Sequence, residues 1–251
     1  EPGQAVTPEL ALRELKGARY DAVCLTQNET STGVFNPIPE IVRAIRQAAP
    51  EACVLVDAVS SLSAVELDFD SVDADLWLAG VQKAIALPPG LAVHALSRRA
   101  VAKAGSVSNR GWTTDLLRVR DAMAKHQTPA TPSVSHLYAL RRQLERIHEE
   151  GLAARAARHR EMAAMVHEWA AARGHEILAQ EGYRSPTVTC LRAQGRPPAG
   201  ILADVAERAN ARLGGGYGDL KAEWLRIGHM GEHRPERLRE ILAAIDASLE
   251  T

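Results

Sequence analysis

Short apolar runs alternate with longer stretches of helical periodicity along the first half of the chain. The apolar runs predict strands at residues 20–26, 53–57, 75–80 and 91–96, and the helical period predicts helices at 8–16 and 38–48. A strand, a helix and a second strand within about forty residues form a βαβ unit, which requires parallel strands and a right-handed crossover. The pattern therefore predicts an α/β fold.

The helical period dominates the middle of the chain. After a helix near residues 116–123, two nearby prolines break the pattern, and longer helices follow at 134–147 and 152–172. The arginines, histidines and glutamates of the last of these helices fall on its polar side. We therefore expect them in solvent, including His159 and His167.

The last part of the chain alternates again. It predicts strands at 187–191 and 224–227 and helices at 201–213 and 235–249. These elements indicate a small α/β unit with a sheet of its own. We expect a larger unit over residues 1–173, which includes the bridging helices, and a smaller one over residues 174–251.

A glycine cluster at residues 214–218 lies inside the smaller unit. It follows a predicted helix and precedes a predicted strand. Phosphate-binding loops have the opposite order, with the strand before the helix. The cluster is therefore expected to cap the helix and to form a flexible turn.

Composition narrows the class of protein. The 251 residues are 46% hydrophobic and 24% charged, with a formal net charge of −1, which argues against a general nucleic-acid surface or an anionic-membrane surface. No apolar run approaches the ~18 residues of a membrane span, and no HExxH motif or other metal site is expected. Cys24, Cys53 and Cys190 all fall in apolar runs, which is typical of buried thiols in a reducing cytoplasm.

Lys83 is the most informative residue of the chain. It follows the third apolar run, and Asp57 ends the second. Because ligands bind at the carboxyl ends of parallel strands, both side chains should face one pocket. A lysine against apolar neighbours can act as an amine nucleophile, and an amine beside a carboxylate is the pair that pyridoxal phosphate requires. A surface lysine and a turn-forming aspartate would give the same spacing.

Five segments, in this order along the chain, resemble the class V aminotransferases of fold type I, in particular the serine or alanine:glyoxylate and serine:pyruvate aminotransferases. They are TQNETSTGV (26–34), VDAVSSLSAVELD (56–68), GVQKAIALPPGLA (80–92), QTPATPSVSHLYAL (127–140) and LRIGHMG (225–231). The resemblance implies a mainly parallel central sheet with helices on both faces, plus a smaller C-terminal α/β domain. It also implies pyridoxal 5′-phosphate as cofactor and a homodimer with shared active sites.

The reaction implied is transfer of an amino group between a small α-amino acid, of the serine or alanine type, and an α-keto acid such as glyoxylate or pyruvate. Lys83 matches the family's lysine that forms a Schiff base with the cofactor, and Asp57 matches the carboxylate that pairs with the pyridinium nitrogen. Arg226 matches the arginine that holds the substrate carboxylate, and a guanidinium fork suits that task. An exposed arginine beside Glu223 is the alternative for that position.

The resemblance implies further cofactor contacts. Thr30 matches the residue whose hydroxyl contacts the phenolic oxygen of the cofactor, and Val59 matches the apolar residue that packs under its ring. Gln82 matches a residue that contacts the cofactor phosphate. Thr128 or Thr131 matches the residue that contacts the phosphate of the partner's cofactor. The family's phosphate-binding turn and the aromatic residue that stacks on the ring are expected before Glu1, in an N-terminal part that this sequence lacks.

Other functions share parts of this pattern. Phosphoserine aminotransferases would need extra cations, for which Arg110 and His126 are candidates. Class V desulfurases and lyases are also similar, but a desulfurase needs a mobile nucleophilic cysteine, and the three cysteines fall in predicted strands. A truncated, catalytically silent subunit with this fold is a third alternative.

Overall fold

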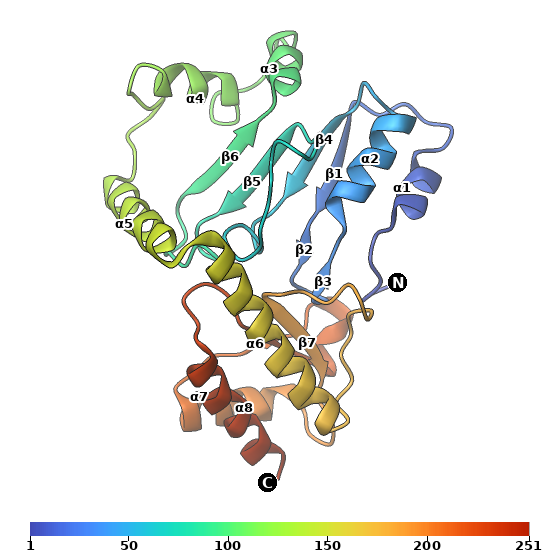
Figure 1. Cartoon of the computed structure of the whole chain (residues 1–251), viewed down its shortest axis with the longest axis vertical. Coiled ribbons are helices and arrows are strands. Elements are labelled where there is room, and N and C mark those ends of the chain that lie inside the picture. Colours follow the sequence, from blue (N-terminus) through green and yellow to red (C-terminus); the bar gives the residue numbers. More distant parts are fainter. Residues whose placement is uncertain (251) are drawn as a thin grey trace.

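The computed structural model describes residues 1–250 and is built around a four-stranded sheet. Its strands lie in the order β1 (Ala22–Thr26), β4 (Cys53–Asp57), β5 (Leu76–Gly80) and β6 (Ala92–Leu96). The first three are parallel, so their carboxyl ends meet at one edge, whereas β6 pairs with β5 in the antiparallel direction. The predicted α/β fold with a mainly parallel sheet is confirmed (Figure 1).

Two helices cover one face of this sheet. Helix α1 (Pro8–Leu15) begins at Thr7, whose side chain accepts a hydrogen bond from the backbone of Leu10, and α2 (Ile38–Ala48) connects the first strands. The core beneath them is formed mainly by buried apolar residues of α2, β4 and β5, namely Ile38, Ile41, Val42, Ile45, Val54, Val56 and Trp77. This burial explains why these elements gave the clearest periodic signals.

The opposite face of the sheet is only partly covered. Alternate residues of the strands point to it, and register aligns Cys24, Leu55, Leu76 and Leu96 in one row. Helices α3 (Arg98–Gly105) and α4 (Leu116–Met123) border this face at the amino ends of the parallel strands. Cys24 is exposed there, so the prediction that all three cysteines are buried is wrong for this residue.

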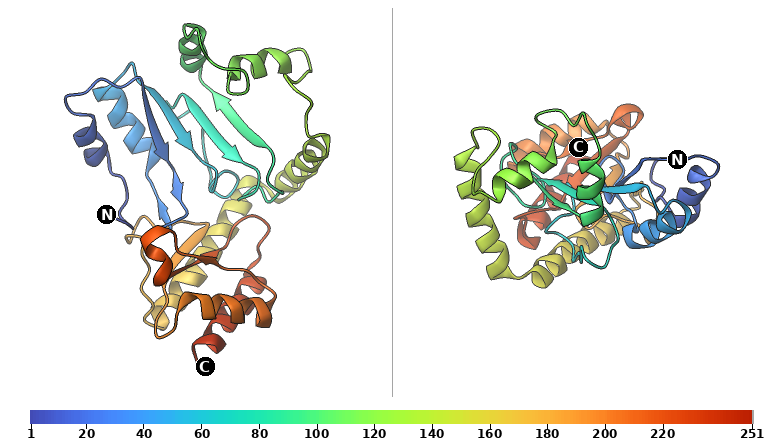
Figure 2. Two further views of the ribbon diagram at one scale, coloured as in Figure 1. Left: turned by 180° about the vertical axis from the view of Figure 1, so that it is seen from behind. Right: turned by 90° about the horizontal axis from the view of Figure 1, so that it is seen from above.

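Two long helices lead to the second part of the molecule. Helix α5 (Val134–Glu150) ends at Gly151, and α6 (Leu152–Ala172) passes from the sheet to the smaller unit (Figures 1 and 2). Arg155, Arg158 and His159 on α6 are buried, so the expectation that its charged residues lie in solvent is wrong for these three. Their burial places a polar network between the two units.

The smaller unit has an antiparallel sheet in the order β7 (Val188–Arg192), β9 (Trp224–Gly228) and β8 (Gly214–Gly215). Helices α7 (Pro198–Ala209) and α8 (Pro235–Leu249) pack with it. The shared core draws on α6 as well as on the unit's own elements, with Met162, Val166, Leu191, Ile201, Val205, Ile227, Leu238, Ile241 and Ile245 among its buried residues.

The glycine cluster differs from its prediction. Helix α7 ends at Ala209 because Asn210 adopts a left-handed conformation with φ of 45°. Gly214 and Gly215 then form strand β8, which pairs with β9, and a short 3-10 helix (Gly218–Ala222) follows. The cluster therefore does not cap the helix, and its first two glycines pair with the strand that carries Arg226.

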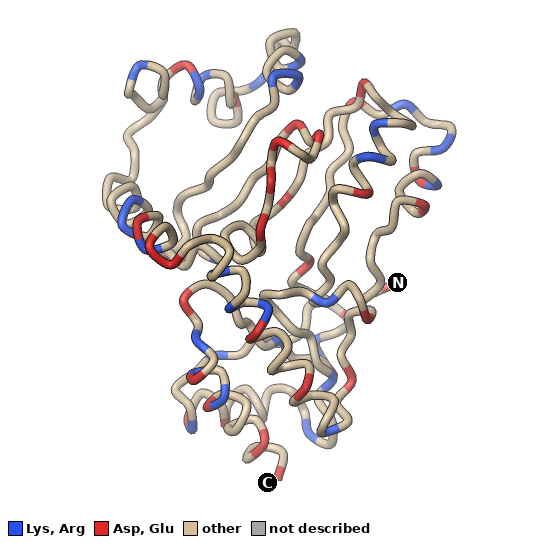
Figure 3. The backbone as a smooth tube through the Cα atoms, in the orientation of Figure 1, with Lys and Arg blue, Asp and Glu red and all other residues tan. Residues whose placement is uncertain are grey.

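Charged residues of both signs are distributed along the whole chain (Figure 3). One carboxylate, Asp75, is buried at the amino end of β5, where it accepts hydrogen bonds from the backbone of Val54 and from the side chains of Ser97, Arg99 and Arg46. Burial opposes its ionisation, but these donors hold the pKa of Asp75 below its ordinary value. Within residues 1–250, none of the helices combines the length and apolar composition that crossing a membrane requires.

Candidate active site

Lys83 lies in a tight turn directly after β5. The backbone N–H of Ala86 donates to the carbonyl of Lys83 at 2.9 Å, and that of Leu87 donates to Val81 at 2.9 Å. The ε-amino group of Lys83 is half-buried, and it has no hydrogen-bond or ion-pair partner among residues 1–250. The turn therefore fixes the backbone of the lysine and leaves its amine free for a ligand.

Asp57 is the last residue of β4 and lies at the same edge of the sheet. Register pairs it with Thr26 on one side and Leu78 on the other. Its Oδ1 accepts a hydrogen bond from the backbone of Val59 at 2.8 Å, and its other oxygen has no partner in the described part of the chain. The side chain points to the partly covered face, so a flat ligand over that face could reach the free oxygen.

Thr30 is carried by a short hairpin formed by β2 (Asn28–Glu29) and β3 (Val34–Phe35). The hairpin is tied to the smaller unit because the side-chain amide of Asn28 donates to the hydroxyl of Thr187 at 2.9 Å. The sequence did not predict these two-residue strands. Their effect is to bring the end of β1 and the start of β7 together.

Arg226 lies on β9 and reaches across to this hairpin. Its Nη1 donates to the carbonyl of Thr30 at 3.3 Å, and its Nε donates to the carbonyl of Gly215 at 2.8 Å. The guanidinium also lies over the ring of Tyr217, with 4.2 Å between its Cζ and the ring centroid. Nη2 has no partner within residues 1–250, so one edge of the fork stays available for a carboxylate.

Gly214 makes room for this guanidinium. A Cβ atom added at Gly214 would lie 3.1 Å from Nη2 of Arg226. Arg226 was named from the sequence as a candidate, but Gly214, Gly215 and Tyr217 were not identified as its neighbours. The only signal in the sequence was the unusual density of glycine one strand before the arginine.

Val59 and Gln82 flank the two central residues. Val59 follows Asp57 in the chain and is half-buried, whereas Gln82 precedes Lys83 and is exposed. The side chain of Gln82 folds back over Gly80, where an added Cβ would lie 2.3 Å from its Oε1. Glycine at position 80 therefore leaves the space that the amide of Gln82 occupies.

Thr128 and Thr131 are separate from this cluster. Both are exposed in the connection between α4 and α5, which runs beyond β6 in Figure 1. The hydroxyl of Thr128 donates to the carbonyl of Ala130 at 2.7 Å. Within a single chain, the structure does not bring these threonines to Lys83.

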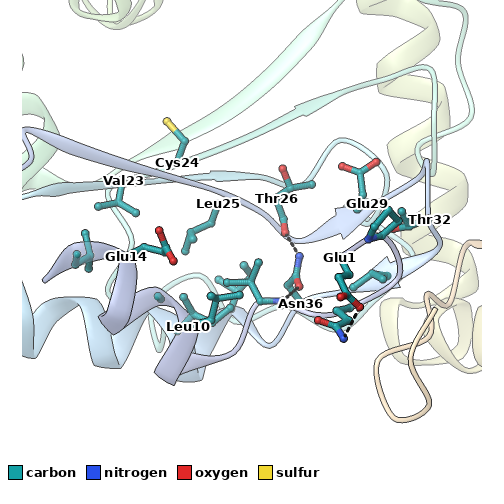
Figure 4. Close-up of a pocket in the computed structure, with 18 of the residues that line it drawn as sticks. Glu1, Leu10, Glu14, Val23, Cys24, Leu25, Thr26, Glu29, Thr32 and Asn36 are labelled. Atoms are coloured by element: carbon teal, nitrogen blue, oxygen red, sulfur yellow. Dashed lines mark hydrogen bonds between the residues drawn. The ribbon is translucent and has the colours of Figure 1, made fainter. Parts of the chain in front are cut away.

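Two hollows compete as binding sites. A groove of about 840 Å³ runs along β1 and α1, with Leu10 and Leu25 on its walls and a hydrogen bond between Asn36 and Thr26 beside it (Figure 4). None of its lining residues is a lysine, an arginine or a histidine. A cleft of about 740 Å³ between the two units has Gln82 and Lys83 among its lining residues.

The cleft is lined by only two of the predicted site residues, Gln82 and Lys83. Its remaining walls come from the smaller unit, including Arg212, Met230 and Arg234. Asp57 and Arg226 are not part of its walls. Asp57 lies toward the partly covered face of the four-stranded sheet, and Arg226 contacts the hairpin that carries Thr30. We regard Lys83, with Asp57 and Arg226 beyond the cleft, as the candidate site, because chemistry and not volume distinguishes it.

The residues considered for alternative functions lie elsewhere. Nε of Arg110 is 3.1 Å from Asp115, in a groove at the amino ends of the parallel strands, so it cannot serve a ligand at Lys83. Burial raises the pKa of the Cys190 thiol to about 11, and burial followed by the charge of Asp75 raises that of Cys53. Both effects disfavour the thiolate that a desulfurase requires.

Comparison with known proteins agrees with the geometry. The family model "Aminotransferase class-V" matches residues 2–213. The small subunit of a soluble hydrogenase from Synechococcus sp. is 35% identical over 98% of this chain and 64% of its own length, and a serine–glyoxylate aminotransferase from Methylorubrum extorquens is 34% identical over 96% and 62%. The crystal structure of pyridoxamine–pyruvate aminotransferase from Mesorhizobium loti superposes with a TM-score of 0.92 at 27% identity, covering 99% of this chain and 64% of that one.

The chain thus spans less than two thirds of the length of these relatives. The match nevertheless includes the segments that carry Lys83 and Asp57, and the whole described fold superposes on the aminotransferase structure. The chain belongs to the class V aminotransferase family.

Proposed function

We propose that this chain forms the catalytic part of a pyridoxal phosphate-dependent aminotransferase that moves an amino group between a small α-amino acid and an α-keto acid such as glyoxylate or pyruvate. One observation carries the proposal. Lys83, whose amine has no partner within residues 1–250, follows the carboxyl end of β5. The neighbouring strand β4 ends in Asp57, whose carboxylate has one oxygen without a hydrogen bond in the same residues.

The residues of this chain provide groups that suit the aldehyde and the ring nitrogen of this cofactor. The amine, a carboxylate oxygen and one edge of a guanidinium all lack protein partners within residues 1–250, and these are the groups that an aldehyde, a pyridinium nitrogen and a substrate carboxylate need. Val59 and Thr30 would contact the ring, and the amide of Gln82 would contact the phosphate. When bound, the cofactor supplies an electron sink for the bonding electrons of the substrate Cα–H bond.

Each side chain then has one task. The amine of Lys83 would accept the proton from the substrate Cα and deliver it to the cofactor carbon that exchanges the amino group. The carboxylate of Asp57 keeps the ring nitrogen protonated, because a nearby negative charge raises that nitrogen's pKa. Arg226 holds the substrate carboxylate through its free edge and so fixes the direction of the Cα–H bond.

The choice of substrates rests on the relatives. The serine–glyoxylate aminotransferase from Methylorubrum extorquens supports serine as donor and glyoxylate as acceptor. Arg110, the cation expected to hold a substrate phosphate, is paired with Asp115 and so does not support phosphoserine as the substrate.

The assembly proposed is a homodimer. In it, Thr128 and Thr131 would contact the cofactor phosphate in the partner's site, which accounts for two exposed threonines that lie apart from Lys83. Residues 1–173 would form the larger domain and residues 174–251 the smaller. The three free cysteines support a reducing cytoplasmic compartment.

The test uses the polypeptide as its gene encodes it. The purified protein is mixed with pyridoxal phosphate, its visible absorbance is recorded, and borohydride reduction followed by peptide mass mapping identifies the modified lysine. We expect the label on Lys83 and turnover with L-serine and glyoxylate. Lys83→Ala should lose the absorbance and the turnover together, whereas Lys16→Ala, at the exposed end of α1, should keep both.

Two results would overturn the proposal. The first is turnover retained by Lys83→Ala. The second is a wild-type protein that folds, as judged by circular dichroism, but gains no label on Lys83 and no transamination activity.

A further inference from the structure

The turn that carries Lys83 is held by a buried network on α6. Arg155 is 1% exposed, and its Nη2 donates to the carbonyl of Ala84, the residue after the lysine, at 2.9 Å. The hydroxyl of Ser63 donates to the same carbonyl, also at 2.9 Å. Two donors from distant parts of the chain therefore fix the peptide between Ala84 and Ile85, one residue beyond Lys83.

The same guanidinium reaches the smaller unit. Nη1 of Arg155 donates to Glu150 and to Glu232, each at 2.9 Å, and Glu232 also accepts from Gln143 at 2.7 Å. Arg158, one helical turn further, pairs with Glu150 at 2.7 Å and donates to the carbonyl of Gly231 at 3.1 Å. One buried cluster thus connects the bridging helix, the Lys83 turn and the loop that follows β9.

His159 completes this connection. Its Nε2 accepts a hydrogen bond from the backbone N–H of Gly231 at 3.0 Å, so the proton must be on Nδ1, which donates to the carbonyl of Arg155 at 2.7 Å. Burial, followed by the charges of Arg158 and Arg155, lowers the pKa of His159 to about 4, which agrees with a neutral ring. The ring is therefore a fixed spacer between α6 and Gly231.

Gly231 packs directly against the turn. An added Cβ would lie 2.9 Å from the Cβ of Ala86 and 3.4 Å from the carbonyl oxygen of Lys83. The turn itself is strained at Ala86, which has a φ of 65°, a region that non-glycine residues rarely adopt. Ser63, which donates to the turn from another part of the chain, has a φ of 77°. Strain of this kind persists only where surrounding contacts impose it, and it gathers at functional sites.

We infer that Arg155 is a positioning residue for Lys83, which sets the lysine turn and the Gly231 loop of the smaller unit through one guanidinium. Movement of the smaller unit, which carries Arg226, would therefore be transmitted to the base that removes the substrate proton. The inference rests on the proposed role of Lys83. It adds a connection, through Arg155, between the Lys83 turn and the loop that follows β9 in the smaller unit.

The test compares Arg155→Met with Arg160→Met. Arg160 lies on the same helix, but it is exposed and pairs only weakly with Glu66, at 3.5 Å. Amide hydrogen exchange is measured first, without cofactor, at Ala86 and Leu87. Loss of a charged donor to the neighbouring carbonyl should speed exchange there by about tenfold, whereas Arg160→Met should leave it unchanged.

Kinetics supply the second measurement. Because a displaced Lys83 affects proton transfer more than carboxylate binding, Arg155→Met should lower kcat about tenfold with KM within about twofold. Arg155→Lys should restore only part of kcat, since an ammonium cannot reach all three acceptors in a fork. Ser63→Ala, which removes only the second donor to Ala84, should speed exchange at the same two amides and covers the case in which Arg155→Met does not fold.

Exchange and kcat at the wild-type level in both Arg155→Met and Ser63→Ala would overturn the inference. So would faster exchange spread evenly over the molecule, which would mean a purely structural role. Turnover retained by Lys83→Ala would instead overturn the proposed function, and the exchange result would still decide whether Arg155 holds the turn.

Discussion

Nη1 of Arg226 donates a hydrogen bond to the carbonyl oxygen of Thr30 at 3.3 Å, although 196 positions separate the two residues in the chain. The bond joins β9 of the smaller unit to the hairpin that follows β1. It also uses the backbone of Thr30 and leaves the hydroxyl free. Arg226, for which we propose substrate binding, and the edge of the parallel sheet are therefore held together by a contact that leaves the Thr30 hydroxyl and Nη2 of the guanidinium unused.

Replacing Arg226 by lysine should raise KM for the amino acid by about tenfold to a hundredfold, because an ammonium cannot keep the bonds to Thr30 and Gly215 and also hold a carboxylate with two parallel bonds. Steady-state kinetics measure the change. Arg192→Lys is the control, since Arg192 also stacks on an aromatic ring, Trp224, but lies at the far end of the same sheet. Equal KM in the two variants would contradict the assigned role.

Gly214→Ala should weaken substrate binding without affecting cofactor binding. The new Cβ would lie 3.1 Å from Nη2 of Arg226 and would displace the free edge of the fork. Gly215→Ala, on the same strand, meets no atom within 4 Å and should change KM much less. Competitive inhibition by an unreactive carboxylic acid separates the two variants, and similar inhibition constants would show that Gly214 does not matter.

Asp57→Asn should lower kcat on the order of 100-fold, because it removes the charge that stabilises the protonated ring nitrogen. Asparagine keeps an oxygen for the hydrogen bond from Val59, so the fold of this turn should not change. Visible absorbance should still report the cofactor on Lys83. An unchanged kcat would mean that the carboxylate is only a turn-forming group.

Glu150 should contribute to stability in a manner that depends on pH. The hydrogen bond from Arg158, followed by that from Arg155, overcomes burial and lowers its pKa from 4.5 to about 2. A depressed pKa in the folded state stabilises the protein above the unfolded pKa, and that stability is lost as the pH falls from about 5 toward 2.

Glu150→Gln should therefore lower the free energy of unfolding at pH 7 by about 2 kcal/mol and flatten its acid dependence. Urea unfolding at pH 7 and at pH 3 measures both effects. Glu149→Gln, at an exposed position beside it, should behave as wild type. A parallel acid dependence in the two variants would contradict the assignment.

The sequence predicted the parts of the site that belong to regular elements. Asp57 and Lys83 follow apolar runs whose buried side chains impose the strand period, so their common edge could be derived from pattern alone. Helix α3 was missed because its apolar positions are alanines and one valine, which give only a weak stripe. Strand β8 was missed because its two glycines cannot show the alternation of apolar and polar side chains that marks a strand. The roles expected of the site residues came from the family resemblance and not from the pattern.

Arg155 and His159 were assigned to solvent from their residue type, although the helical period places both on the face of α6 that carries Met162, Val166 and Trp169. Arg160 lies outside that face. The partners of the two buried residues, Ala84 and Gly231, are 71 and 72 positions away and could not be identified from the sequence.

The left-handed conformation of Ala86 has a consequence for engineering the protein. Such a conformation costs a residue with a side chain about 1 kcal/mol or more, so Ala86→Gly should raise the melting temperature. The same change would remove the methyl group that meets Gly231 and loosen the turn of the reactive lysine. The backbone conformation of Ala86 therefore lowers thermal stability while it holds the turn of Lys83. A variant at this position with a higher melting temperature should have a lower kcat.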